Sequence, residues 1–540
     1  MSERYESAGP TMTGCKMTHY KLSPGLWTLG LLAVALWATP GVWAQDTSTP
    51  PASGTPDASP QTQEPIAAYG QDNPPPPVIE NPPLSGIDLP NVEPHAAPLS
   101  YIQPGATVSQ SIDTNPETTP GGQSAYSVSR ALGSVTLQRL WSHYDVALDY
   151  EGGAAYYSLH GEGFKALQQM DLNQKISWKR GELNVRESFS YLPEGNFGAA
   201  YGSLGSTGMQ SLGNTGAAPL LSGAILGSEG LVPRILNISM ADVSEYLSPK
   251  SAITAAAGYG FTHFYGSDST FGAEPVTFIG SSEVFAQVGY NRILSSHTQV
   301  AIMYAYQDFN FNFSDLSFHS NVFQLVYGHR ISGRLDFLIG AGPQLTSIGT
   351  PSEDCSDPTV PPGLLCALEG DTNIPVTVKD QRLGIAGRVR LRYKFPKTFL
   401  QASYNRYETS GSGLFAGSQT DLAQLTISRP LTRVWSLSGD LGYSRNARLQ
   451  PLSAAELDNC GQTGQPACPG VNANSYTYGF AGAAVHRQIG HNFHAFVSYQ
   501  FNELSFDNSF CAGTTVCNRI SNRQVATFGL DWTPRPIRLD

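Results

Sequence analysis

The sequence predicts an all-β fold, a single large antiparallel β-barrel of about 18 strands, within a range of roughly 16–20 because strand boundaries taken from sequence are uncertain by several residues. Three observations lead to this prediction. Apolar and polar residues alternate with a period of two over most of the chain, the alternating segments are long, and the connections between them are short and long in turn. No helical period is found after the N-terminal apolar stretch.

The alternation is clear in the segment 434–445, where Trp435, Leu437 and Leu441 alternate with serine, aspartate and glycine residues. It recurs in the segments 144–151, 284–291 and 495–502. Such a pattern predicts strands with one apolar and one polar face. Each segment spans about 9–16 residues, which is longer than most soluble strands and suits a strand that crosses a membrane at a tilt. The predicted strands lie near 100–112, 126–141, 143–157, 164–178, 182–191, 234–247, 251–264, 280–293, 297–310, 318–331, 333–346, 380–394, 398–408, 418–430, 433–446, 474–488, 491–506 and 520–532.

The connections alternate in length. Tight turns are predicted at 141–143, 179–181, 248–250, 295–296, 332–333, 395–397, 431–432 and 489–490. The largest loops are predicted at 192–233, 347–379, 447–473 and 507–519. Short turns at one end and long loops at the other are typical of a transmembrane β-barrel. Closure is expected because a strand edge in hydrocarbon would leave backbone donors and acceptors unpaired.

Composition excludes several other classes. Charged residues make up 14% of the chain, and 32 Lys and Arg face 43 Asp and Glu. A coiled coil would be richer in charged helix formers, and a nucleic-acid-binding protein would carry a basic face, so no nucleic-acid partner is predicted. No apolar run after the N-terminal region is long enough for a membrane helix.

The first hundred residues predict a leader and a linker. Lys16 and Lys21 precede the apolar stretch Leu26–Trp37, so 1–44 is predicted to be a secretory signal peptide cleaved after Ala44, with a membrane anchor as the alternative. Between Gln45 and Pro104, 15 of 60 residues are proline and none is Lys or Arg. We therefore predict that 45–98 is a disordered Pro-rich periplasmic tether and that 99–540 is the barrel. A ligand for a periplasmic partner is the alternative to a solvated linker.

Together these features resemble the Gram-negative outer-membrane β-barrel class, porin-like in size, over residues 100–540. The final predicted strand, with Ala526, Phe528, Leu530 and Trp532, is similar to the aromatic strand that the barrel-assembly machinery reads, although TPRPIRLD follows Trp532. The resemblance implies outer-membrane lipid around the barrel and both termini in the periplasm. No plug domain is predicted before the barrel.

Six cysteines fall within predicted long loops as the pairs Cys355–Cys366, Cys460–Cys468 and Cys511–Cys517. An even number in an exported chain predicts disulfides, and pairing within each loop is the expected connectivity. A metal site is the alternative, but the spacings are irregular and no histidine lies near the pairs. No metal or cofactor is predicted.

The candidate lumen residues are charged side chains on alternate positions of two predicted strands. Arg388, Arg390, Arg392 and Lys394 share one face of a predicted strand and form a basic ladder. Asp145, Asp149 and Glu151 form an acidic ladder on another strand. Both are expected to face the lumen, because a charge facing lipid at mid-depth costs about 2–4 kcal/mol. Opposed ladders would tune ion selectivity. Alternatively, the charges pair as a structural network or lie near the periplasmic rim.

Catalytic motifs are weak. His491 and His494 would point to opposite sides of a strand, and no nucleophile elbow or phosphate-binding loop is present. The favoured function is a passive, non-enzymatic channel for small polar solutes or ions, with the loop 192–233 either constricting the lumen or covering its mouth. The alternatives are a non-conducting surface barrel that binds partners through its loops, and an outer-membrane lipid or polysaccharide hydrolase.

Overall fold

The computed structural model describes the chain over residues 84–85, 100–115, 125–158, 163–192, 233–265, 268–271, 274–312, 317–353, 375–395, 397–411, 413–450, 473–511 and 518–539. Contacts divide the chain into two units, and the second, Glu64–Asp540, contains all of these residues. No helix in these ranges is both long and apolar enough to cross a membrane.

The strands of this unit follow one another along the chain, with one short 3-10 helix, η3 (Asn508–Cys511), near the C-terminus. They are β1 (Tyr101–Asp113), β2 (Tyr126–Leu140), β3 (Tyr144–Tyr157), β4 (Gly163–Trp178), β5 (Gly181–Leu192), β6 (Arg234–Ser248), β7 (Ser251–Phe264), β8 (Asp268–Phe271), β9 (Glu274–Thr277), β10 (Ser281–Ser295), β11 (Thr298–Phe311), β12 (Ser317–Ser332), β13 (Leu335–Glu353), β14 (Pro375–Lys394), β15 (Phe399–Thr409), β16 (Ser418–Pro430), β17 (Trp435–Arg448), β18 (Ser475–Ile489), β19 (Phe493–Phe506), β20 (Ile520–Trp532) and β21 (Ile537–Arg538).

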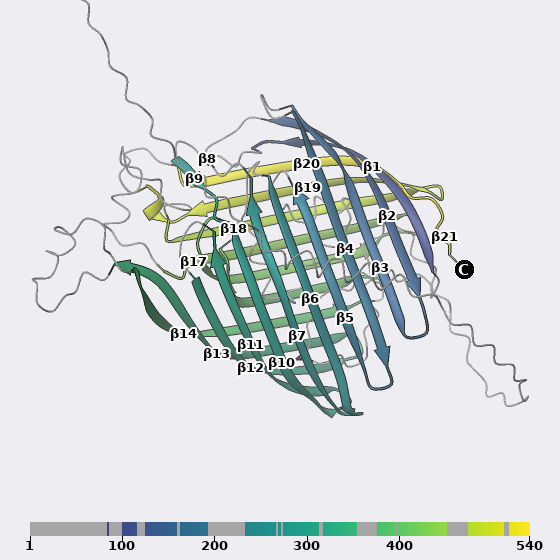
Figure 1. The fold of residues 1–540 in the computed structure, drawn as a ribbon. Coiled ribbons are helices and arrows are strands. Elements are labelled where there is room, and N and C mark those ends of the chain that lie inside the picture. Colours follow the sequence, from purple (N-terminus) through teal and green to yellow (C-terminus); the bar gives the residue numbers. More distant parts are fainter. Residues whose placement is uncertain are drawn as a thin grey trace, which may run out of the picture. The chain divides into compact units, whose positions relative to one another are not determined.

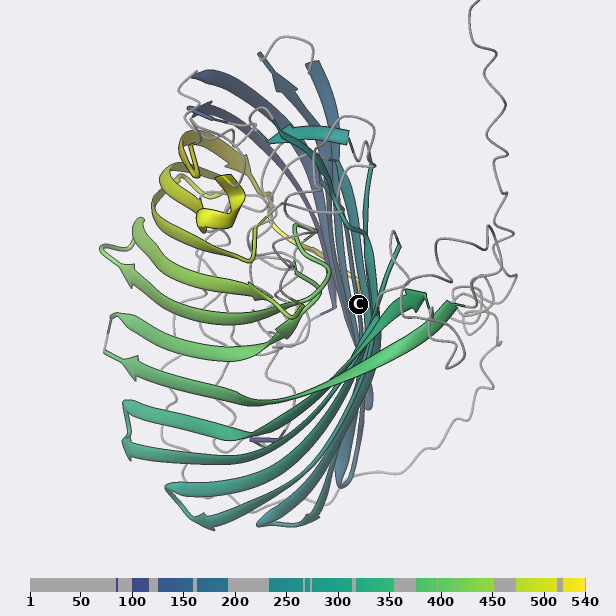
Figure 2. The same ribbon diagram turned by 90° about the vertical axis from the view of Figure 1, so that its left-hand side faces the viewer.

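Eighteen long strands in the described ranges, β1–β7 and β10–β20, form one closed antiparallel barrel in which each strand pairs with its neighbours in sequence (Figures 1 and 2). The first and last strands close it, with pairs running from Ala106↔Trp532 to Asp113↔Val525. Closure leaves no open edge along the barrel wall, and the predicted fold class is confirmed.

The C-terminal tail continues the ladder beyond Trp532. Ile537 pairs with Ile102 and Arg538 with Tyr101, so β21 pairs with the first two residues of β1, which β20 does not reach. The Gln103 side chain donates to the Pro534 carbonyl at 2.7 Å. The residues that follow Trp532 therefore extend the pairing of the first strand.

The predicted strands agree with the observed ones to within a few residues, with one main exception. β13 and β14 pair as far as Glu353↔Pro375, well into the predicted loop 347–379, and extend beyond their neighbours (Figure 2). Gly349 and Pro351 mark a loop in sequence, but the hairpin continues because each strand needs only the other as a partner there. The small hairpin β8–β9 was not expected either.

Tight connections join β2–β3, β4–β5, β6–β7 and the later pairs through β18–β19, as predicted, and they lie at one end of the barrel, hereafter the turn end. β1 begins and β20 ends at the turn end, because Tyr101 pairs with Gln138 and Trp532 with Phe493. The other end, hereafter the loop end, carries the longer connections.

The two faces of the wall differ in polarity. Side chains on the outer face are largely apolar and exposed; they include Val108, Ile112, Tyr150, Ile253, Val284, Val288, Ile302, Phe323, Leu325, Ile385, Val389, Leu391, Leu441, Tyr443, Val497, Tyr499 and Phe528. Polar residues on the alternate positions are buried; they include Thr107, Ser109, Asp113, Arg130, Asn291, Gln324, Gln344, Arg388, Asp440, Gln500, Asn502 and Arg523. The apolar face is thus turned outward, which is the reverse of a soluble barrel.

Several predictions lie outside the described residues and stay predictions. They are the signal peptide 1–44, most of the tether 45–98, the loop 192–233 between its end residues, and the cysteine pairs, of which only the Cys511 backbone is described.

Candidate functional site in the lumen

The basic ladder lies in the half of β14 nearer the turn end. Arg388, Arg390 and Arg392 alternate with Val389 and Leu391, whose side chains are exposed on the outer face. The arginines therefore point inward, because successive strand residues alternate between faces. Arg392 Nε lies 3.1 Å from both carboxylate oxygens of Asp336 on β13, and Nη2 lies 2.9 Å from Oδ2. Lys394 ends the strand beside the turn.

The acidic ladder lies on β3, also nearer the turn end. Asp145, Asp149 and Glu151 alternate with the exposed Tyr150 and share their face with the buried Ala147. Thr136 Oγ1 donates to Asp149 Oδ1 at 2.6 Å. Two more carboxylates extend the acidic wall, one on the neighbouring strand and one three strands away. Asp171 on β4 is the cross-strand partner of Asp149, and Asp531 on β20 occupies the corresponding face near the seam.

The two ladders lie on opposite walls of the barrel. In the described strand order, β4–β7 and β10–β13 separate β3 from β14 in one direction, and β15–β20, β1 and β2 separate them in the other. Eight strands intervene either way. The lumen therefore has one acidic and one basic wall at similar depth, and an ion or zwitterion between them would meet a transverse field.

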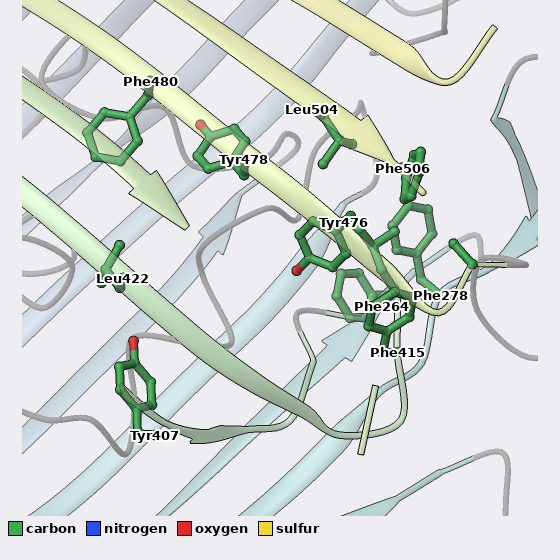
Figure 3. Close-up of a cluster of buried hydrophobic side chains, with 12 residues drawn as sticks. Phe264, Phe278, Tyr407, Phe415, Leu422, Tyr476, Tyr478, Phe480, Leu504 and Phe506 are labelled. Atoms are coloured by element: carbon green, nitrogen blue, oxygen red, sulfur yellow. The ribbon is translucent and has the colours of Figure 1, made fainter. Parts of the chain in front are cut away.

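An aromatic cluster lies at the loop end of the lumen. It contains Phe264, Phe278, Tyr407, Leu414, Phe415, Leu422, Ala473, Tyr476, Tyr478, Phe480, Leu504 and Phe506. The rings of Phe264 and Phe278 stack with their centroids 5.2 Å apart, and the ring centroids of Phe415 and Tyr476 are 5.1 Å apart (Figure 3). Because β7 and β18 are opposite strands of the barrel, this cluster joins two opposite walls at the mouth.

The connection between β15 and β16 turns inward to supply part of this cluster. Ile279 N donates to the Gly413 carbonyl at 2.9 Å, which ties the connection to the residues before β10. Gly413 and Gly417 have φ values of 80° and 86°, a region that favours glycine. A Cβ on Gly413 would lie 2.5 Å from the Phe264 ring, so the close approach also needs glycine. The sequence GSGLFAG, glycine-rich around an apolar pair, could have indicated this connection, but sequence reasoning missed it.

Two residues of the predicted tether also lie in the lumen. Leu84 and Ser85 are buried against the inner wall, where Arg388 Nη2 donates to the Leu84 carbonyl at 2.7 Å. The sequence placed them in a disordered periplasmic segment. They lie inside instead, because the wall offers hydrogen-bond partners for their backbone and an apolar contact for the leucine.

The histidines do not form a metal centre in the described ranges. His491 is exposed in the turn before β19, whereas His494 is buried on the inner face. No group of three or more His, Cys, Asp or Glu side chains among the described residues is arranged to hold a metal ion.

The sequence matches no protein-family model and no curated protein. Similar solved structures include OccK2 (OpdF) of Pseudomonas aeruginosa, at 8% identity and a TM-score of 0.36, covering 80% of this chain and 98% of that one. The outer membrane protein OpdK of the same organism shows 10% identity and a TM-score of 0.35, covering 80% and 99%. The ferric-catecholate import receptor Fiu of E. coli shows 7% identity and a TM-score of 0.39, covering 80% and 81%. At these TM-scores the similarities carry no argument, and the barrel fold rests on the strand pairing.

Proposed function

We propose that this protein is a passive channel for small polar solutes or ions in the outer membrane of a bacterium. The observation that carries the proposal is the arrangement of the barrel wall, apolar and exposed outside, polar and charged inside. A closed wall of this kind satisfies its backbone in lipid and offers solutes a polar path. The opposed ladders select among the solutes by charge.

A row of aromatic residues on the outer face supports the membrane placement. Each of these residues is exposed and lies beside a tight turn or at the chain's return to the turn end; they are Trp141, Trp178, Phe395, Trp435, Phe493 and Trp532. Aromatic residues gather at the membrane–water interface, where the ring is half in hydrocarbon and the polar atom is in water. The row marks one such interface at the turn end, which the proposal assigns to the periplasm.

A non-conducting surface barrel is the second candidate, and one observation favours it. The aromatic cluster joins opposite walls at the loop end, and its members Leu414, Phe415 and Leu504 are completely buried. A mouth packed in this way would slow or stop solute passage. In that case the longer connections at the same end would carry the function by binding partners.

Conductance separates the two candidates. The mature chain from Gln45, refolded and inserted into a planar bilayer, is expected to give steady, stepwise ion conductance because the lumen wall is polar. Heat-modifiable migration on a gel, measured on the same sample, reports whether the barrel has folded. A folded barrel without conductance would overturn the channel and favour the surface barrel.

The membrane placement makes a separate prediction for the outer face. Leu325 lies at the middle of β12 and is 63% exposed, whereas Ile331 lies near the turn end of the same strand and is 56% exposed. Leu325→Arg should lower the unfolding free energy in lipid vesicles by about 2–4 kcal/mol, and Ile331→Arg by about 0–1 kcal/mol, because the cost of a charge depends on depth. Equal losses for the two variants would contradict the membrane placement.

A further inference from the structure

Leu84 is held in the lumen through its backbone and its side chain. Its N–H donates to Asn291 Oδ1 on β10 at 3.2 Å, and its carbonyl accepts from Arg388 Nη2 on β14 at 2.7 Å. The second bond carries the arginine charge and is of the stronger kind. Both main-chain polar groups of Leu84 are thus satisfied by side chains of the wall.

Ser85 is held by side chains of β7 and β10. Its carbonyl accepts from Thr254 Oγ1 on β7 at 3.0 Å and from Gln287 Nε2 on β10 at 2.7 Å. Its hydroxyl lies 2.8 Å from Thr254 Oγ1. Three of these wall partners, Thr254, Asn291 and Arg388, are themselves buried. The hydrogen bonds recognise mainly main-chain atoms, as peptide-binding sites do.

The wall also has a place for the leucine side chain. Leu84 packs with Ala301, Val326 and Leu338 in an apolar cluster on an inner face that is otherwise largely polar. Gly328 lies beneath it, and a Cβ there would lie 2.9 and 3.1 Å from the two Leu84 methyl groups. On β10, two strands away from Gly328, a Cβ on Gly289 would lie 2.4 Å from the Ser85 Cβ. The two glycines leave the room that the dipeptide occupies.

We propose that the inner wall formed by β7 and β10–β14 is a binding site for a leucine-bearing peptide segment, that the protein's own Leu84–Ser85 occupies it, and that this occupancy restricts the channel. The restriction rests on the proposed channel function, whereas the binding site does not. The chemistry of the ligand is set by the site: main-chain N–H and carbonyl groups, one leucine side chain and a following small polar residue.

The geometry of the chain permits this intramolecular binding. Asn291 and Arg388 lie near the turn-end termini of β10 and β14, and Ser100 precedes β1 at the same end. The 15-residue span from Ser85 to Ser100 can reach about 50 Å when extended. A short tether gives the bound segment an effective concentration of about millimolar, so a free peptide of the same sequence can compete with it.

Disulfide trapping tests the binding site without reference to conductance. Ser85→Cys combined with Thr254→Cys should form a disulfide on mild oxidation, because the two hydroxyls lie 2.8 Å apart. The matched control combines Ser85→Cys with Ser498→Cys on β19, a buried position on a distant part of the wall. Both variants keep the natural cysteines, and mass spectrometry of proteolytic fragments identifies the new link. A link in the first variant alone supports the site, and equal linking in both or in neither overturns it.

Conductance of the full mature chain then tests the restriction. Leu84→Asp places a charge in the apolar cluster, and Gly328→Val fills the space beneath the Leu84 side chain. Because each variant removes the free energy of burying the leucine, each should raise the fraction of time that the channel is open by roughly tenfold or more. Gly479→Ala is the control, since no atom lies within 4 Å of the added Cβ. A synthetic peptide with the sequence of residues 81–88 (NPPLSGID) should close the Leu84→Asp channel, and its Leu→Asp counterpart should not.

The outcomes distinguish the two proposals. A specific link with no conductance in either the oxidised or the reduced protein would leave the site standing and overturn the channel. Conductance in the natural protein without a specific link would leave the channel standing and overturn the site. A specific link that leaves conductance unchanged between the oxidised and reduced protein would overturn the restriction.

Discussion

Asp113→Ala is expected to lower the unfolding free energy of the barrel by about 3–5 kcal/mol, because it removes the carboxylate from a fully buried ion pair. Asp113 lies on β1 and Arg523 on β20, the two strands that close the barrel. Arg523 Nε lies 2.9 Å from both carboxylate oxygens of Asp113, and Nη2 contacts Oδ2 as well. The Asp113 and Arg523 side chains are 1% and 0% exposed, so water cannot solvate the arginine charge that is left without its carboxylate.

The measurement is guanidinium unfolding of the refolded protein in lipid vesicles, followed by tryptophan fluorescence. Glu182→Ala is the matched control. It breaks the Lys175–Glu182 ion pair, which has a 3.1 Å separation and side chains 21% and 29% exposed, and should cost at most about 1 kcal/mol. The double variant Asp113→Asn with Arg523→Gln should lose less unfolding free energy than the sum of the losses of its two single variants, because no buried charge is then left without a partner. A loss for Asp113→Ala no larger than that of the control would contradict the role of this pair at the seam.

Neutralising the two ladders should shift ion selectivity in opposite directions. Changing Arg388, Arg390 and Arg392 to glutamine should raise the ratio of cation to anion permeability, and Asp149→Asn with Glu151→Gln should lower it. A unit charge about 4–8 Å from a passing ion changes its free energy by about 0.5–1 kcal/mol in water, so each set should move the ratio by roughly three- to tenfold.

Reversal potentials across a planar bilayer under a KCl gradient report this ratio. The shift should be clear near 0.1 M salt and largely lost near 1 M, where the Debye length falls to about 3 Å. Arg487→Gln is the control: this arginine stacks 5.1 Å from the Trp435 ring at the turn end, on the exposed outer face. An equal shift from Arg487→Gln, or shifts of the same sign from both ladders, would refute a field across the lumen.

Much of the wall could be predicted from local pattern. The period of two fixes which residues of a strand share a face, so the sequence alone predicts that Arg388, Arg390 and Arg392 point to the same side. Glycine, proline and serine at the turns marked the strand ends to within a few residues. The predicted ends of β13 and β14 were wrong, because the same residue types occur there within paired strands. The hydrogen bonds between the two strands outweighed a loop-like composition.

The sequence by itself determined that this chain forms long alternating strands, joins them by short turns at one end, and turns its apolar side chains to the face away from its charges. These properties depend on neighbouring residues and backbone pairing. Only the tertiary structure decided that the two ladders lie on opposite walls, because that depends on the strand number at which the barrel closes. It also decided that Phe264 shares one cluster at the mouth with Tyr476 and Phe415, and that Leu84 lies against Arg388. Those contacts join residues more than a hundred positions apart in the sequence, and no local pattern records which distant surfaces closure brings together.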